Sequence, residues 1–141
     1  MPEDCDVSKP RLIRLSWAGS LTILVSVTAV WLIRLAAVSI LHPKEEFMPL
    51  TPGPPVFDTI VAAGAAVVVF ARIWSDSLEP AREYRSLAAK VLIVSFAPDV
   101  ALAVMHGFGG GWPEAFALMA MHIAVGAICV TMLPALCWAH R

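Results

Sequence analysis

Four long runs of apolar residues dominate the chain, and polar or proline-rich segments separate them. The runs lie at approximately residues 15–41, 56–74, 87–105 and 115–139. A helix needs about 20 mostly apolar residues to cross the hydrocarbon core of a bilayer. The pattern therefore predicts an all-α integral membrane protein, in which the 141 residues form a single domain, an antiparallel four-helix transmembrane bundle.

The composition supports this prediction. Hydrophobic residues make up 59% of the chain and charged residues 15%, and the mean hydropathy is +0.77, whereas a soluble domain usually holds about 45–50% apolar and about 25% charged residues. The net charge of −1 indicates no electrostatic attraction to nucleic acid. We therefore expect the lipid bilayer as a partner and no nucleic acid. The sequence leaves open whether the protein forms a homo-oligomer or joins a larger membrane complex.

Lysine and arginine gather on one side of the predicted bundle. The N-terminal tail, the connection between the second and third runs, and the C-terminal end carry Lys9, Arg11, Arg14, Arg72, Arg82, Arg85, Lys90 and Arg141. Cytoplasmic loops are enriched in these residues, so we expect a multi-pass protein of the plasma membrane with both termini in the cytoplasm. The first run is longer than the 7–15 apolar residues typical of a signal peptide, which favours an uncleaved anchor.

Two connections have distinctive compositions. The segment "HPKEEFMPLTPGPP", residues 42–55, is rich in proline and is expected to be an extended outer loop rather than a helix. The segment "SDSLEPAREYRS", residues 75–86, is a polar inner connection that can form a short interfacial helix with Pro80 near its start.

The third run contains a proline and a carboxylate, Pro98 and Asp99. The helical rise places Asp99 about 18 Å from the cytoplasmic face, and His122 of the fourth, antiparallel run about 20 Å from the same face. Arg34 lies about 28 Å up the first run, where its side chain can extend to the outer surface or reach towards Asp99. Asp99, His122 and Arg34 are therefore the candidate residues of a ligand site or proton path.

Three interpretations of Asp99 stay open at this point. In the first, Pro98 breaks the helix and Asp99 satisfies backbone N–H groups that the break frees. In the second, Asp99 pairs with His122 or Arg34 and orders the bundle. In the third, Asp99 is a functional carboxylate in a path for protons, ions or a ligand, since an ionisable group is costly at this depth.

Cofactor chemistry has little support in the sequence. Haem would need His122 to face His106 or His42, yet His106 lies about 10 Å from the depth of His122. An outer metal site has weak candidates in His42 and His106, with Glu45, Glu46 and Glu114 nearby, but no diagnostic spacing. The known nucleotide-binding and hydrolase motifs are absent from the sequence. We therefore expect no metal, no cofactor and no catalytic residues.

The order of these features resembles a family of four-span bacterial membrane proteins, common in actinomycetes and described as a domain of unknown function. The similar segments are "PLTPGPPVFDTIVAAGAA", "VSFAPDVA" and "ALMAMHIAVGAICVTMLPAL", the last containing Met121, His122 and Pro134. In that family the first span often carries a polar amide where this chain has "SVTAVW". The resemblance implies a four-span architecture and no particular activity.

The leading functional hypothesis is a small non-enzymatic membrane protein, an accessory or structural component with an intramembrane cluster of Asp99, His122 and Arg34. A small-substrate transporter or proton-coupled channel, oligomeric because four helices enclose little space, is the alternative. A membrane redox protein that binds haem b is the third hypothesis.

Overall fold

The computed structural model describes residues 8–42, 48–106 and 110–138. They form four long helices, α1 (Ser8–Leu41), α2 (Gly53–Asp76), α3 (Pro80–Val104) and α4 (Trp112–Trp138), and a short 3₁₀ helix, η1 (Met48–Leu50). Each of the four predicted runs is one helix, so the all-α prediction is confirmed. Glu45 and Glu46 of the weak metal set, and residues 107–109 of the glycine-rich turn, lie outside the described residues.

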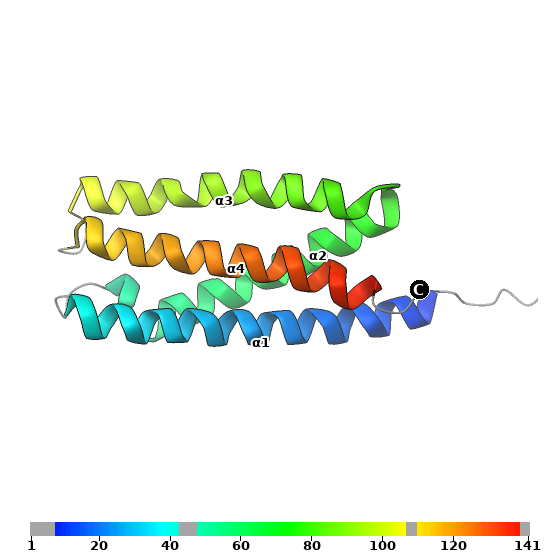
Figure 1. The fold of residues 1–141 in the computed structure, drawn as a ribbon, viewed down its shortest axis with the longest axis horizontal. Helices are drawn as coiled ribbons and strands as arrows, with labels where there is room; N and C mark the ends of the chain where they lie inside the picture. The colour runs from blue at the N-terminus through cyan, green and yellow to red at the C-terminus, as the bar shows by residue number, and fades with distance from the viewer. Residues whose placement is uncertain (1–7, 43–47, 107–109, 139–141) are drawn as a thin grey trace, which may run out of the picture.

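Successive helices run in opposite directions and form a bundle (Figure 1). Helices α1, α4 and α3 lie side by side along the long axis, whereas α2 crosses behind α4 at an angle, from the side of α1 to the side of α3. The start of α1, the end of α4 and the α2–α3 connection share one end of the bundle, which we name the termini end. The opposite end, which holds η1, is named the η1 end.

The surface of the bundle is that of a membrane protein. All four long helices are long and apolar enough to cross a bilayer. Large apolar side chains that are more than half exposed project from the middle of each helix. Water solvates such side chains poorly, whereas lipid solvates them well. Examples are Leu24, Val68, Ile93 and Ile123. The chain is therefore a multi-pass helical membrane bundle.

Helix α2 begins earlier than the sequence predicts. The prolines at its first turn were expected in an extended loop, but Gly53 is already helical and Pro54 and Pro55 follow it inside the helix. Proline is well tolerated there because the first N–H groups of a helix have no intrahelical partner. Met48–Leu50 of the same predicted loop is the 3₁₀ helix η1, so the expectation of a purely extended loop is wrong.

The polar connection between α2 and α3 is also more helical than expected. It forms no separate interfacial helix, since α3 starts at Pro80 and continues without interruption to Val104. Pro98 does not break α3 either, so the first interpretation of Asp99 is wrong in its premise. Proline lacks one backbone donor, and a membrane helix tolerates that loss when its neighbours support it.

Helix α4 begins with a local cap. The backbone N–H of Gly111 donates to Oε2 of Glu114 at 2.9 Å, and the N–H of Ala115 donates to the Gly111 carbonyl at 3.1 Å. A glutamate in the first turn that reaches back to the N-cap N–H is half of a capping box. Glu114 thus stabilises the start of α4.

Two buried clusters hold the bundle together. The cluster at the termini end takes residues from all four helices, with Ala18, Ala63, Phe70, Tyr84 and Leu133 among its members. The cluster at the η1 end is built from Val30, Leu50, Leu118 and Met121, with Leu102 packed against it. Among the described residues, α2 contributes to the first cluster and not to the second. Helix α2 is therefore packed into a buried cluster at the termini end and not at the η1 end.

Helices α1 and α2 pack closely at Gly19. A Cβ atom placed on Gly19 would lie 2.9 Å from Cγ1 of Val67, which is shorter than van der Waals contact allows. Small residues let membrane helices approach this closely. Gly19 therefore fixes α2 against α1 near the termini end.

Candidate functional site

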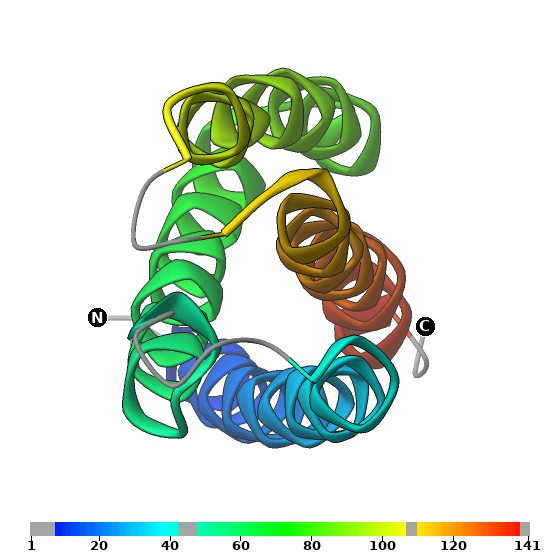
Figure 2. The ribbon, with the colours of Figure 1, turned by 90° about the vertical axis from the view of Figure 1, so that its left-hand side faces the viewer.

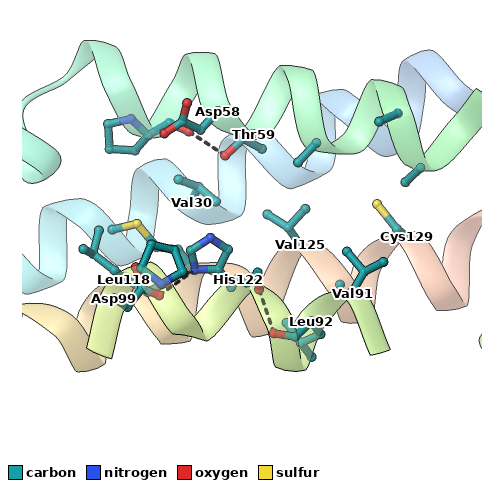
Figure 3. A pocket seen from close by; sticks show the side chains of 18 of the residues that line it. Val30, Asp58, Thr59, Val91, Leu92, Asp99, Leu118, His122, Val125 and Cys129 are labelled. Atoms are coloured by element: carbon teal, nitrogen blue, oxygen red, sulfur yellow. Dashed lines mark hydrogen bonds and ion pairs between the residues drawn. The ribbon is translucent and has the colours of Figure 1, made fainter. Parts of the chain in front are cut away.

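A cavity of about 680 Å³ lies among the helices. Its walls come from all four long helices and from η1, and Figure 3 shows several of the side chains that line it. Ligand sites in proteins usually enclose about 300–1,000 Å³ and are mostly apolar, with a few polar groups. The size and lining of this cavity match that description.

The oblique course of α2 explains where the cavity forms. Figure 2 shows α2 running obliquely across the bundle. Because α2 is absent from the cluster at the η1 end, its side chains leave the cavity open there. The side of α2 that lines the space carries alanines at positions 62, 65 and 66. Such short side chains leave it unfilled, since protein interiors otherwise pack to the density of organic crystals. The cavity is thus a consequence of helix tilt combined with small residues.

The cavity opens between α2 and α3. Ala62 and Ala65 of α2 and Val91 of α3 all line it, and all three are exposed. Val91 keeps 59% of its surface exposed although it contributes to the wall. These residues lie in the middle of membrane-spanning segments, so the opening faces the lipid side of the bundle.

An aromatic cluster lies between the cavity and the termini end. The ring of Phe70 contacts Trp74 at 5.3 Å and Tyr84 at 5.0 Å between centroids, in both cases edge to face. Tyr84 and Cys129 belong to the buried cluster at the termini end and also line the cavity. The cavity therefore ends on packed side chains in that direction.

Asp99 and His122 meet on the wall of this cavity. Oδ2 of Asp99 lies 3.0 Å from Nδ1 of His122, and the Asp99 residue is only 4% exposed. The side chain of His122 is 40% exposed and borders the open space (Figure 3). The matching depths predicted for these residues are confirmed by this contact. The Asp99–His122 pair of the second interpretation is therefore present, and its role in ordering the bundle stays a prediction.

Nδ1 of His122 has two acceptors beside it. The Leu118 carbonyl lies 3.0 Å away, as close as the carboxylate oxygen. A nitrogen between two acceptors needs a hydrogen, so the contacts assign the hydrogen to Nδ1. One hydrogen aligns poorly with two acceptors, and Oδ2 of Asp99 accordingly receives no well-aligned hydrogen bond from the described residues. The buried carboxylate is close to a donor but incompletely satisfied.

A second carboxylate, Asp58, lines the cavity from α2. Asp58 is exposed, and its neighbour Thr59 is buried and donates to the Pro55 carbonyl at 2.6 Å. Figure 3 shows Asp58 and Asp99 on opposite walls at the same end of the cavity. Sequence reasoning did not select Asp58, although a carboxylate near the start of an otherwise apolar span was a signal that could have found it.

Arg34 lies apart from the Asp99–His122 pair. Its Nε donates to the Leu50 carbonyl at 2.8 Å, and its guanidinium carbon lies 5.1 Å from the ring centre of Trp31. The ion pair that the described residues give Asp99 is with His122, not with Arg34. Arg34 therefore anchors η1 against α1, and the Arg34 form of the second interpretation is not observed.

The remaining histidines have positions at helix ends. His42 follows α1 and His106 follows α3, both exposed and both in the left-handed backbone conformation, with φ of 44° and 50°. Such residues commonly terminate helices. Neither lines the cavity with His122, and the described part of the chain contains no group of three side chains arranged to hold a metal ion.

Comparisons with protein-family models, curated proteins and solved structures find no match to this chain. The resemblance to the four-span bacterial family therefore stays a prediction that rests on the quoted segments. Function has to be argued from the cavity itself.

Proposed function

We propose that this protein is a non-enzymatic membrane component that binds a small, largely apolar molecule in the cavity among its four long helices. The observation that carries the proposal is a cavity of about 680 Å³ with mostly apolar walls and the Asp99–His122 pair on one of them. An apolar space with a few convergent polar groups is the usual form of a ligand site.

The entrance supports uptake from the bilayer. Exposed lining residues on α2 and α3, among them Ala65 and Val91, stand on the lipid-facing side of the bundle. A molecule dissolved in the membrane reaches such an opening without passing through water. The aromatic cluster around Phe70 lies beneath the cavity, which favours a binding site over a continuous pore.

The orientation belongs to the same proposal. The plasma membrane would hold the protein with the termini end in the cytoplasm, because Arg14, Arg72, Arg82 and Arg85 are at or near that end. The end of the cavity that holds Asp58, Asp99 and His122 then lies in the outer half of the bundle, and the lining extends from there to Tyr84.

A small-substrate transporter is the second candidate, favoured by the ionisable pair on the cavity wall. Transport requires a further path past Phe70, Trp74 and Tyr84, and this additional requirement ranks it below simple binding.

Binding of a neutral triphenyl compound, triphenylphosphine oxide, tests the proposal. The protein in nanodiscs is titrated by calorimetry against empty nanodiscs, so that partition into lipid is subtracted. We expect saturable binding to one site, and we expect Ala65→Phe, which places a ring in the cavity, to weaken it at least about tenfold.

Val68→Phe is the matched control. Val68 lies on the same helix, is 69% exposed and does not line the cavity. We expect this variant to bind as the native protein does. Equal binding by the native protein and Ala65→Phe, or no saturable binding to either, would refute the cavity as the site.

A further inference from the structure

We infer that the molecule bound in this cavity is an organic cation with a lipophilic body, held by the carboxylates of Asp58 and Asp99. The inference deepens the proposed function and rests on it, because it names the chemical class of the ligand for the same cavity.

The charge of the lining supplies the first argument. Among the described residues that line the cavity, the charged or chargeable groups at its η1 end are Asp58, Asp99 and His122, and no lysine or arginine contributes. The nearby Arg34 is already engaged with the Leu50 carbonyl and the Trp31 ring. The walls therefore combine negative charge with apolar surface.

The two contacts of His122 require only one hydrogen on its ring. A neutral imidazole with its hydrogen on Nδ1 meets both contacts, to Leu118 O and to Asp99 Oδ2. The second nitrogen, Nε2, needs no proton for either contact. When Asp99 is ionised, this arrangement carries one negative charge, which a cation in the cavity can neutralise.

Incomplete hydrogen bonding of Asp99 supplies the second argument. Asp99 is only 4% exposed, yet its Oδ2 accepts no well-aligned hydrogen bond from the described residues. A buried carboxylate in this state is costly, and its cost falls when a donor or a cation approaches. The positive charge of an ammonium or phosphonium group in the cavity lowers that cost by electrostatic attraction.

Position and shape supply the third argument. Asp58 and Asp99 stand on opposite walls at one end of the space, and Val91 and Cys129 line it further from that end (Figure 3). The apolar lining also includes Ala65 and Tyr84. A molecule with its charge at one end and an apolar body behind it matches this layout. A bare metal ion does not, because the described residues bring no three ligands together and the apolar remainder would stay empty.

Tetraphenylphosphonium and tetraphenylborate test the inference, because they have nearly the same size and shape and opposite charge. Each is titrated by calorimetry into the full-length protein in nanodiscs of neutral phosphatidylcholine, with triphenylphosphine oxide as the neutral member of the series. We expect the cation to bind at least about tenfold more tightly than the neutral probe, and the anion to bind more weakly than both.

Two variants locate the charge. Asp58 is exposed and Asp58→Asn is expected to fold normally, so it reports on binding even if Asp99→Asn disturbs the bundle. We expect each variant to lower the affinity for the cation by about threefold to thirtyfold relative to the affinity for the neutral probe. Asp76→Asn is the control, since Asp76 lies at the termini end and pairs with Arg72.

The outcomes separate the two proposals. Equal affinity for all three probes, or preference for the anion, overturns the inference and keeps the cavity as a binding site. Loss of all binding overturns both. Displacement of the three probes alike by added phospholipid would make a lipid chain the occupant and would also overturn the inference.

Discussion

The carboxylate of Asp99 on α3 lies 3.0 Å from the imidazole of His122 on α4, and the same ring nitrogen lies 3.0 Å from the Leu118 carbonyl of its own helix. His122 is thus held by its own backbone as well as by Asp99. This shared contact decides how much the pair can contribute to stability, and it separates a structural from a functional role.

A double-mutant cycle measures that contribution. We expect Asp99→Asn and His122→Gln to show a coupling energy below about 1 kcal/mol, because side-chain hydrogen bonds between membrane helices average about 0.6 kcal/mol. The measurement is unfolding in mixed micelles with increasing dodecyl sulfate, followed by circular dichroism. Asp99→Asn combined with Thr131→Val, which is exposed on α4, is the additive control. A coupling above about 2 kcal/mol would show that the pair holds the bundle together.

The contact between α1 and α2 predicts a contrast between two glycines. Gly19→Ala would bring a Cβ atom to 2.9 Å from Cγ1 of Val67, a β-branched side chain that cannot easily rotate away in a helix. We expect a loss of about 1–3 kcal/mol in the same unfolding assay. Gly64→Ala is the control, since no atom lies within 4 Å of its added methyl group. It should be neutral or gain up to about 1 kcal/mol, and equal effects of the two would contradict the close approach.

Substitution of Arg34 is expected to weaken the attachment of η1 and to leave cation binding in the cavity nearly unchanged. Arg34→Met removes the donor to the Leu50 carbonyl, and Leu50 is buried. An unsatisfied buried acceptor costs about 1–3 kcal/mol, so we expect faster proteolysis near residues 48–52 and lower stability. Tetraphenylphosphonium binding should change less than about threefold. A large loss of cation binding on this substitution would instead assign Arg34 to the ligand site.

Topology can be tested at two positions on opposite ends of the bundle. Leu78 is fully exposed in the α2–α3 connection, and His106 is exposed beyond α3. In a Cys5→Ser background, Cys129 and Cys137 remain buried. A membrane-impermeant maleimide added to intact cells should label His106→Cys and should label Leu78→Cys only after permeabilisation. Labelling of both variants in intact cells would contradict the proposed orientation.

Much of the fold follows from simple features of the chain. The apolar runs predict four helices because a bilayer allows few other spanning structures. That Asp99 and His122 lie at the same depth follows from the rise per residue in two antiparallel helices, and the 3.0 Å contact between them confirms it. These features depend on distances along a helix axis, which residue number determines directly.

The features that sequence reasoning missed depend on direction around and between helices. The tilt of α2 creates the cavity, and no run of residues encodes a tilt angle. For Arg34 the sequence left two directions open, outward or towards Asp99, and the side chain takes the first, to the Leu50 carbonyl at the η1 end. Asp58 joins the site because of that same tilt, although it is far from Asp99 in the chain. A break of α3 at Pro98 was one of three open interpretations, yet one missing donor does not end a helix that its neighbours support.

The opening between α2 and α3 has a consequence for how strongly the site must bind. A molecule that enters from the bilayer is drawn from a thin phase in which lipophilic compounds accumulate far above their aqueous concentration. The relevant ligand concentration is then the one in the membrane, and a site of modest intrinsic affinity fills at low concentrations in solution. Aqueous dissociation constants measured with different lipids should therefore follow the partition coefficient of the ligand, while the occupancy at a fixed membrane concentration stays the same.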